Sequence, residues 1–304
     1  MLTVDNASVS YRQPGRGKLH AVREASLSLN EGETLAIVGE SGSGKSSLVR
    51  GLLGLVPLES KGFVFDGKRR DIQMVFQDPA GSLNPQMRVA AIVEEPLRVH
   101  AADLDRAARR ERVIDILAAV GLDESFLTRY PHELSGGQAQ RVAIARALLL
   151  KPRVLVCDEA VAALDGSVRH RILELLRQLQ AKMGLSIIFI AHDLAVVRSI
   201  SHRIVVMYLG RVVEVADNQS LFTRPQHPYT RALLDAVPVP DPTSGHTPTP
   251  LAGEIPSAFA PPAGCAFHPR CPEAIAECQA AVPQLRASNG SKAACIRINV
   301  PAAE

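Results

Sequence analysis

The amino-acid sequence predicts an α/β fold in which helices cover both faces of a mostly parallel sheet. Three short apolar runs, at residues 153–157, 186–190 and 204–208, have the length and composition of fully buried strands. Helical patterns separate these runs, which is the alternation that a parallel sheet requires. A fourth apolar run, residues 34–38, leads into a glycine-rich loop and then a helix, the order that phosphate-binding folds use.

The other elements follow from apolar periodicity and from turn residues. The segment 89–149 is predicted to be mostly helical, and its clearest helix, residues 103–120, ends at Gly121. The remaining expectations are strands at 9–11, 21–29, 63–65 and 72–76, a helix at 45–55 and a last helix that ends near Asp235.

A change in composition divides the chain into two predicted domains. Twelve of the 21 prolines lie between Pro238 and Pro301, beyond the last predicted helix. We therefore expect a main domain over residues 1–237 and a C-terminal extension over residues 238–304. Apolar residues make up 46% of the chain, which is enough for a packed core in the main domain.

Charge and hydropathy argue against two broad classes of protein. The 34 Lys and Arg residues nearly balance the 31 Asp and Glu residues, so the sequence lacks the basic surplus of a dedicated nucleic-acid binder. No run of about 18 or more apolar residues occurs, and the first residues do not resemble a signal peptide. The sequence therefore predicts a cytosolic protein without nucleic-acid partners.

The sharpest motif is the run GESGSGKS at residues 39–46, which fits the phosphate-loop pattern G-x-x-x-x-G-K-S/T between a strand and a helix. Glycines allow backbone N–H groups to converge on phosphates, while a lysine adds positive charge and a serine can ligate Mg²⁺. A chance glycine-rich turn is the alternative, and the flanking strand and helix disfavour it. The predicted nucleotide-binding residues of this region are Gly39, Ser41, Gly42, Gly44, Lys45, Ser46 and Ser47.

Two acidic residues end the apolar strand at 153–157. Buried acids at a strand end need a cation or another partner, and nucleotide-bound Mg²⁺ meets that need. Because adjacent side chains of an extended segment point in different directions, Asp158 can serve the metal while Glu159 faces the attacking water. An acidic helix cap is the alternative interpretation, which the phosphate loop makes less favourable.

The run LSGGQ at residues 134–138 opens a predicted helix, with Ser135 in the capping position. A capped helix start is the plain interpretation of a single Ser-Gly-Gly, but the complete run resembles the signature sequence of the ABC ATPase family. Further residues resemble that family's motifs in their usual order, although each is weak alone. Tyr11 resembles the aromatic residue that stacks on adenine, Gln77 the lid glutamine, Asp165 the D-loop aspartate and His192 the switch histidine.

The resemblance implies a P-loop NTPase fold with a RecA-like core, an antiparallel β arm and a helical subdomain at about residues 80–150. It also implies a head-to-tail dimer, in which each ATP lies between the phosphate loop of one subunit and the LSGGQ run of the other. The signature residues that would contact the partner's ATP are Ser135, Gly136, Gly137 and Gln138.

The same resemblance assigns catalytic roles. Glu159 is expected to act as the general base and His192 to contact the γ-phosphate. The expected ligands of Mg²⁺ are Ser46, Gln77 and Asp158.

Three further runs resemble one subfamily, the ATPases of dipeptide, oligopeptide and nickel importers. The run QDPAGSLNP at residues 77–85 is similar to that subfamily's lid-glutamine loop, and residues 224–234 and 264–272 are similar to its C-terminal extension. This resemblance implies an ATP-hydrolysing subunit of a bacterial peptide importer, bound to the cytoplasmic face of the inner membrane. The expected partners are a sister ATP-binding subunit, two transmembrane permease subunits and an extracytoplasmic solute-binding protein.

Several alternatives stay open at this point. The cargo could be a nickel complex or another small solute, and the functional dimer could contain two identical chains. A soluble ABC ATPase of DNA repair or translation would need a long coiled coil or a second cassette, and the sequence contains neither. A module that binds ATP without hydrolysing it would lack Glu159 or the LSGGQ run, and both are present.

The sequence departs from the family pattern at three places. Ala160 stands where proline or serine is usual, and Ala162 stands where serine is common. Only residues 68–71 separate the Asp66-Gly67 turn from the next predicted strand, where relatives usually carry a longer insertion. A part of the antiparallel arm or its loop is therefore expected to be missing.

Four of the five cysteines lie in the predicted C-terminal extension, with the spacing C-x5-C-x6-C-x16-C. In a reducing compartment such a group favours metal binding over disulfides. Four thiolates suit a 4Fe–4S cluster, whereas structural zinc usually uses paired C-x2-C knuckles. Resemblance to cluster-carrying importer ATPases also favours iron. The proposed ligands are Cys265, Cys271, Cys278 and Cys295, with Zn²⁺ and four inert thiols as the alternatives.

Overall fold

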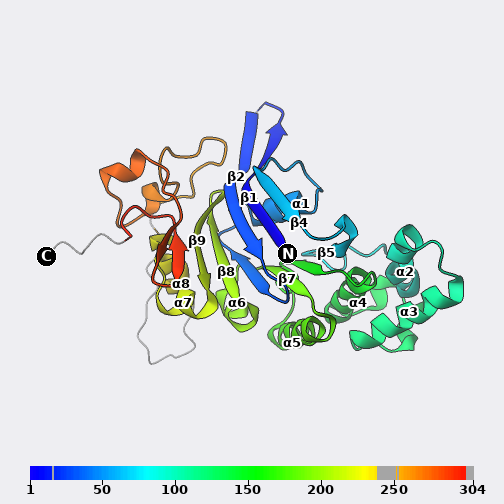
Figure 1. The fold of residues 1–304 in the computed structure, drawn as a ribbon. Helices are drawn as coiled ribbons and strands as arrows, with labels where there is room; N and C mark the ends of the chain where they lie inside the picture. The colour runs from blue at the N-terminus through cyan, green and yellow to red at the C-terminus, as the bar shows by residue number, and fades with distance from the viewer. Residues whose placement is uncertain (16, 238–250, 252, 299–304) are drawn as a thin grey trace, which may run out of the picture. The chain divides into compact units, whose positions relative to one another are not determined.

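The computed structural model describes residues 1–15, 17–237, 251 and 253–298, and Figure 1 shows its ribbon. The chain divides into two compact units. The first contains Met1–Leu29, Thr34–Phe65 and the chain from Ala191 onward, and the second contains Asn30–Glu33 and Asp66–Ile190. Among the described residues, no helix is both long and apolar enough to cross a membrane.

An antiparallel arm of three strands opens the first unit (Figure 1). Strand β1 (Leu2–Gln13) lies between β2 (Gly17–Leu29) and β4 (Gly62–Phe65). Alternate residues of β1, such as Leu2 and Val4, are buried, because one face of the arm packs on the core of this unit while the other meets solvent.

Five further strands of the first unit belong to a second sheet. Strand β3 (Thr34–Val38) pairs in parallel with β8 (Arg203–Tyr208), and β8 pairs in antiparallel fashion with β9 (Arg211–Asp217). The hairpin of β10 (Arg286–Ser288) and β11 (Ser291–Ala293) adds to the free edge of β9. The helices of this unit are α1 (Lys45–Leu52), α6 (Leu194–Ile200), α7 (Asn218–Thr223) and α8 (Pro228–Asp235).

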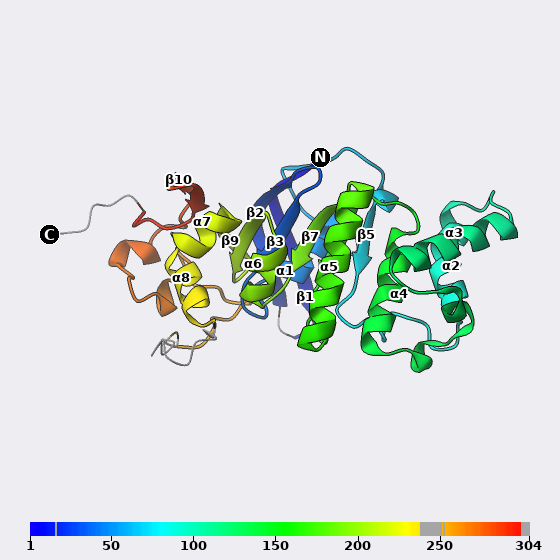
Figure 2. The ribbon, with the colours of Figure 1, turned by 90° about the horizontal axis from the view of Figure 1, so that it is seen from below.

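The second unit combines three parallel strands with a group of helices. Strands β5 (Ile72–Val75), β6 (Val154–Asp158) and β7 (Ser186–Ile190) pair in that order, and β6 and β7 are buried at every residue. In Figure 2, α2, α3 and α4 lie beside one another, and contacts join each pair of them. The helices are α2 (Val89–His100), α3 (Arg106–Ala119), α4 (Gly136–Leu148) and α5 (Gly166–Met183).

The structure confirms the predicted order of strands and helices and corrects several bounds. The first helix ends at Leu52, short of the predicted residue 55, and the strand predicted to reach residue 76 ends at Val75. Helix α3 begins at Arg106 because Asp105 caps it by accepting a hydrogen bond from the Ala108 N–H at 2.7 Å. The sequence did not predict strand β9 or the hairpin β10–β11.

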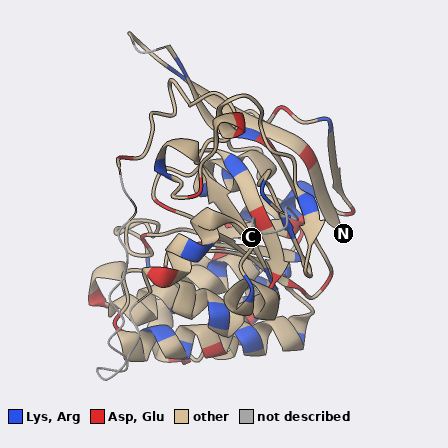
Figure 3. Ribbon diagram, turned by 90° about the vertical axis from the view of Figure 1, so that its left-hand side faces the viewer, with Lys and Arg blue, Asp and Glu red and all other residues tan. Residues whose placement is uncertain are grey.

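The short segment before β5 forms a 3₁₀ turn, Arg69–Asp71. Its last residue, Asp71, accepts a hydrogen bond from the Lys68 N–H at 2.7 Å, so the turn closes on itself. The predicted domain boundary lies between residues 237 and 238, and residues 238–250 lie outside the described residues. Basic and acidic residues are interspersed along the ribbon (Figure 3), in agreement with the small net charge of the sequence.

Candidate nucleotide site

The phosphate loop, residues 39–46, connects β3 to α1 in the first unit. Gly39 and Gly44 have φ values of +147° and +101°, in the region that side chains other than glycine rarely adopt. A Cβ atom at Gly39 would collide with the carbonyl oxygen of Met207, and one at Gly44 with that of Ala21. Gly39 and Gly44 are therefore required by the close approach of β8 and β2 to the loop.

Lys45 is the first residue of α1, and its side chain folds back over the loop. Its Nζ donates to the carbonyl oxygens of Gly39 at 2.8 Å and Glu40 at 2.9 Å, and to the Ser43 Oγ at 3.3 Å. Only 5% of the residue is exposed. The loop thus holds a buried positive charge beside the backbone that would receive phosphate groups.

Two other predicted nucleotide residues meet next to the loop. The Tyr11 hydroxyl, near the end of β1, donates to the Ser47 Oγ of α1 at 3.2 Å. Gly44 occupies the N-cap position of α1 without any side-chain cap. The first turn of α1, which includes Ser46, therefore presents its backbone N–H groups without competition from a capping side chain.

In the second unit, the predicted catalytic glutamate contacts the predicted lid glutamine. The Gln77 Nε2 donates to the Glu159 Oε2 at 2.7 Å. The two residues follow the neighbouring parallel strands β5 and β6, whose pairing ends with Val75 opposite Cys157. Carboxyl ends of neighbouring parallel strands lie at one edge of the sheet, which explains why residues 82 positions apart meet.

Glu159 adopts an unusual backbone conformation, with φ of +49°. A hydrogen bond from its N–H to the Ile190 carbonyl at 3.0 Å holds this residue against the end of β7. Strained residues of this kind cluster at functional sites, where the surrounding structure enforces them. The preceding residue, Asp158, ends β6 and is only 4% exposed, so its carboxylate is buried at the strand end as predicted.

The signature run begins α4, as the sequence predicts. The Ser135 Oγ accepts from the Gln138 N–H at 3.4 Å, and the Gln138 Oε1 accepts from the Ser135 N–H at 2.9 Å, which completes a capping box. Gly136 is needed less for space than Gly137, where a Cβ atom would collide with Val168. The structure thus gives Ser135 and Gln138 a local structural role in capping α4.

Two candidates from the family motifs lie at or just before helix starts. The Asp165 carboxylate caps α5 by accepting from the Val168 N–H at 2.9 Å, and it also accepts from the Ser167 hydroxyl at 3.0 Å. These hydrogen bonds lower the pKa of Asp165 below its usual value. His192 is exposed in the link between β7 and α6, one residue before the cap Asp193.

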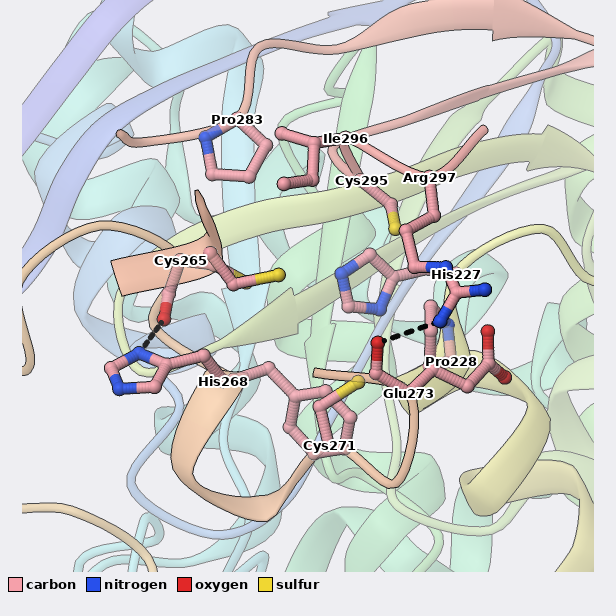
Figure 4. Close-up of a pocket in the computed structure, with 12 residues that line it drawn as sticks. His227, Pro228, Cys265, His268, Cys271, Glu273, Pro283, Cys295, Ile296 and Arg297 are labelled. Carbon is pink, nitrogen blue, oxygen red and sulfur yellow. Dashed lines mark hydrogen bonds between the residues drawn. The ribbon is translucent and has the colours of Figure 1, made fainter. Parts of the chain in front are cut away.

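The four C-terminal cysteines line a single pocket in the first unit (Figure 4). Burial raises the pKa of the Cys271 thiol to about 11 and also raises the pKa of Cys265 and Cys295. Among the described residues, no three His, Cys, Asp or Glu side chains are arranged to hold a single metal ion. The fifth cysteine, Cys157, is fully buried in β6, as predicted.

Sequence reasoning missed two residues that contact the phosphate loop, Tyr229 and Arg270. The Glu40 N–H donates to the Tyr229 Oη at 2.9 Å, and Arg270 forms an ion pair with the Glu40 carboxylate. Both lie in the runs that resemble the importer extension, but nothing in their local pattern indicates a contact about 190 to 230 positions away.

Comparison with known proteins gives matches over most of the chain. The ABC transporter family matches residues 22–162, and the family described as the oligopeptide/dipeptide transporter C-terminal region matches residues 213–278. The oligopeptide transport ATP-binding protein OppF of Escherichia coli is 48% identical over 92% of this chain and 89% of its own length. A probable peptide ABC transporter ATP-binding protein of Sinorhizobium fredii is 47% identical over 94% of this chain and 84% of its own.

Solved structures agree with these matches. The dimeric bacterial ABC transporter cassette MJ0796 is 30% identical, with a TM-score of 0.64 over 72% of this chain and 99% of that one. The same cassette in a post-hydrolysis state bound to ADP and Pi gives a TM-score of 0.65 at 31% identity. The P-loop fold of an ABC ATPase is therefore confirmed, and the chain belongs to the family of ABC transporter ATP-binding proteins that includes the peptide-import ATPases.

Proposed function

We propose that this chain is the ATP-hydrolysing subunit of a bacterial importer for dipeptides or oligopeptides. The observation that carries the ATPase assignment is the glycine-constrained phosphate loop, which holds a buried lysine ammonium over its backbone. Support for peptides as cargo comes from the C-terminal region and from the peptide-transport relatives. We also propose residues 1–237 as the nucleotide-binding domain and residues 238–304 as the extension.

Each predicted site residue has a proposed part in the chemistry. Lys45 would bind the β- and γ-phosphates, and Tyr11 would stack on adenine. Glu159 would accept a proton from the attacking water, and its hydrogen bond to Gln77 orients the carboxylate. His192 would contact the γ-phosphate. The LSGGQ run would bind the ATP held by a partner subunit, and Asp165, besides capping α5, would lie at that dimer interface.

The donor set proposed for Mg²⁺ consists of oxygen atoms only, as this ion prefers. A serine hydroxyl, a buried carboxylate and an amide carbonyl supply it, from Ser46, Asp158 and Gln77. When bound with ATP, Mg²⁺ would neutralise charge on the transferred phosphoryl group.

The four cysteines are the proposed ligands of a 4Fe–4S cluster, with zinc as the alternative. All four line one pocket. In a cubane cluster each thiolate binds a different iron, so the four sulfur atoms need not converge on one point. Binding would supply folding energy to an extension that has few large apolar side chains.

The proposed assembly contains a sister ATP-binding subunit, two transmembrane permease subunits and an extracytoplasmic solute-binding protein, with this chain at the cytoplasmic face of the inner membrane. Two observations support this assembly. The similar proteins of Escherichia coli and Sinorhizobium fredii are named as ATP-binding proteins of transporters, and the similar cassette MJ0796 forms a dimer. We favour a heterodimer, in which the isolated chain would have little ATPase activity.

Isolation of the intact complex from detergent extract tests the proposed function. Mass spectrometry is expected to identify two permease chains, a second ATP-binding chain and bound peptides. Recovery of this chain without permease subunits would contradict an importer. A complex that carries nickel or another small solute would correct the cargo, and one with two copies of this chain would correct the heterodimer.

A further inference from the structure

The C-terminal extension makes a direct ion pair with the phosphate loop. The Arg270 guanidinium donates from Nη1 to the Glu40 Oε2 at 2.8 Å and from Nη2 to the Glu40 Oε1 at 3.2 Å. Arg270 comes from the 3₁₀ turn His268–Arg270 and is 8% exposed. Glu40 is the second residue of the phosphate loop. A two-pronged contact of this kind fixes both partners in geometry as well as charge.

The backbone of Glu40 is held by the same part of the chain. Its N–H donates to the Tyr229 Oη of α8 at 2.9 Å, and Tyr229 is fully buried. The ring of Tyr229 lies against Tyr208 and Phe267, with centroid distances of 4.7 Å and 5.3 Å. Arg270 also donates to the Tyr208 hydroxyl at 3.4 Å. This aromatic cluster therefore positions both groups that contact Glu40.

Glu40 links these contacts to the lysine of the loop. Its carbonyl oxygen accepts from the Lys45 Nζ at 2.9 Å, while its N–H and carboxylate are held by Tyr229 and Arg270. Every polar group of Glu40 is thus engaged. A displacement of its carboxylate would therefore act on the same residue whose carbonyl oxygen accepts from Lys45.

The negative charge of Glu40 is unfavourable for ATP binding, and Arg270 compensates it. A carboxylate in a loop that binds a triphosphate repels the ligand, and such repulsion is strong where water is partly excluded. The partly buried guanidinium neutralises that carboxylate. The Arg270 Nε has no hydrogen-bond partner among the described residues, so the ion pair with Glu40 and the Tyr208 contact are what hold this side chain in place.

We propose that Arg270 is a positioning residue of the nucleotide site, which neutralises Glu40 and fixes the start of the phosphate loop, so that the C-terminal extension sets the affinity for ATP. The proposal rests on the assignment of residues 39–46 as the phosphate loop. In this proposal the extension contributes to the ATP site, in addition to holding the proposed metal cluster through its cysteines.

ATP affinity of the full chain, measured by titration calorimetry at low salt, tests the proposal with three variants. Arg270→Gln is expected to weaken ATP binding about fivefold, because an uncompensated carboxylate then faces the triphosphate. Glu40→Gln is expected to change ATP affinity by no more than about twofold, because it removes the repelling charge together with the ion pair. The double variant Arg270→Gln/Glu40→Gln is expected to return to within about twofold of the original affinity, and added salt should narrow the gap between Arg270→Gln and the original chain.

A matched control separates this effect from simple loosening of the extension. The ion pair between Arg231 of α8 and Glu273, at 2.8 Å, also joins the extension to the main domain without contacting the loop. Arg231→Gln should leave ATP affinity unchanged. Arg270→Lys keeps the charge but not the two-pronged geometry, so it should lose less affinity than Arg270→Gln. Lys45→Ala checks the loop assignment itself, because it should remove most of the ATP binding.

Each outcome is decisive. Equal losses in Arg231→Gln and Arg270→Gln, or failure of Glu40→Gln to rescue Arg270→Gln, would overturn the role of Arg270. Unchanged affinity in folded Arg270→Gln would do the same, provided that Lys45→Ala loses binding. Unchanged affinity in Lys45→Ala would instead overturn the proposed nucleotide site.

Discussion

Two glycines of the phosphate loop are needed for different physical reasons. Gly39 combines a positive φ with a collision between any Cβ atom and the Met207 carbonyl oxygen. Gly42 also has a positive φ, +78°, but no atom lies within 4 Å of the position that its Cβ would occupy. The motif alone does not distinguish these positions, because the distinction depends on how closely β8 passes the loop.

Replacement of each glycine by alanine separates the two effects. Gly39→Ala is expected to destabilise the nucleotide-free protein by about 2–4 kcal/mol, since the loop or β8 must move. Gly42→Ala should cost only about 1–2 kcal/mol, from its backbone conformation. Urea denaturation of the two variants measures the difference. Equal destabilisation would show that the approach of β8 does not constrain the loop.

Most candidate site residues lie where a helix begins or a strand ends. The capping box of α4 and the strand-end acids of β6 were predictable, because capping patterns and apolar runs are local signals. The hairpin β10–β11 was not, because its three-residue strands lack periodicity and depend on pairing with β9. The pocket of four cysteines was predictable as a group from spacing in the sequence.

Metal analysis tests the cysteine pocket. Protein purified without oxygen is expected to be brown and to contain about four irons per chain, as a four-cysteine cubane requires. Cys271→Ser should lose the iron and the colour, because a ligand is removed. Cys157→Ala is the matched control, since Cys157 is buried in β6 and lines no part of the pocket. Stoichiometric zinc without iron would instead identify a structural zinc site, and absence of both metals would refute a metal site.

For the molecule as a whole, the sequence was enough to predict the fold class. The ion pair of Arg270 with Glu40 could not be predicted, because no local pattern relates two residues 230 positions apart. The contact of Gln77 with Glu159 could be expected only after both had been placed at the ends of neighbouring strands. Long-range pairs of this kind can be predicted only from the tertiary fold, whereas phosphate-loop glycines and helix caps can be recognised from short runs of consecutive residues.

The most direct test of the account is peptide-stimulated ATP hydrolysis by the reconstituted importer complex that carries Glu159→Gln. This change keeps the size and hydrogen-bonding reach of the side chain but removes the base, so hydrolysis should fall by about 10²–10⁴-fold while ATP affinity is retained. Glu174→Gln on the exposed face of α5 should hydrolyse ATP at the original rate. Full peptide-stimulated turnover in Glu159→Gln, or a loss of ATP binding as large as the loss of turnover, would contradict the proposed site.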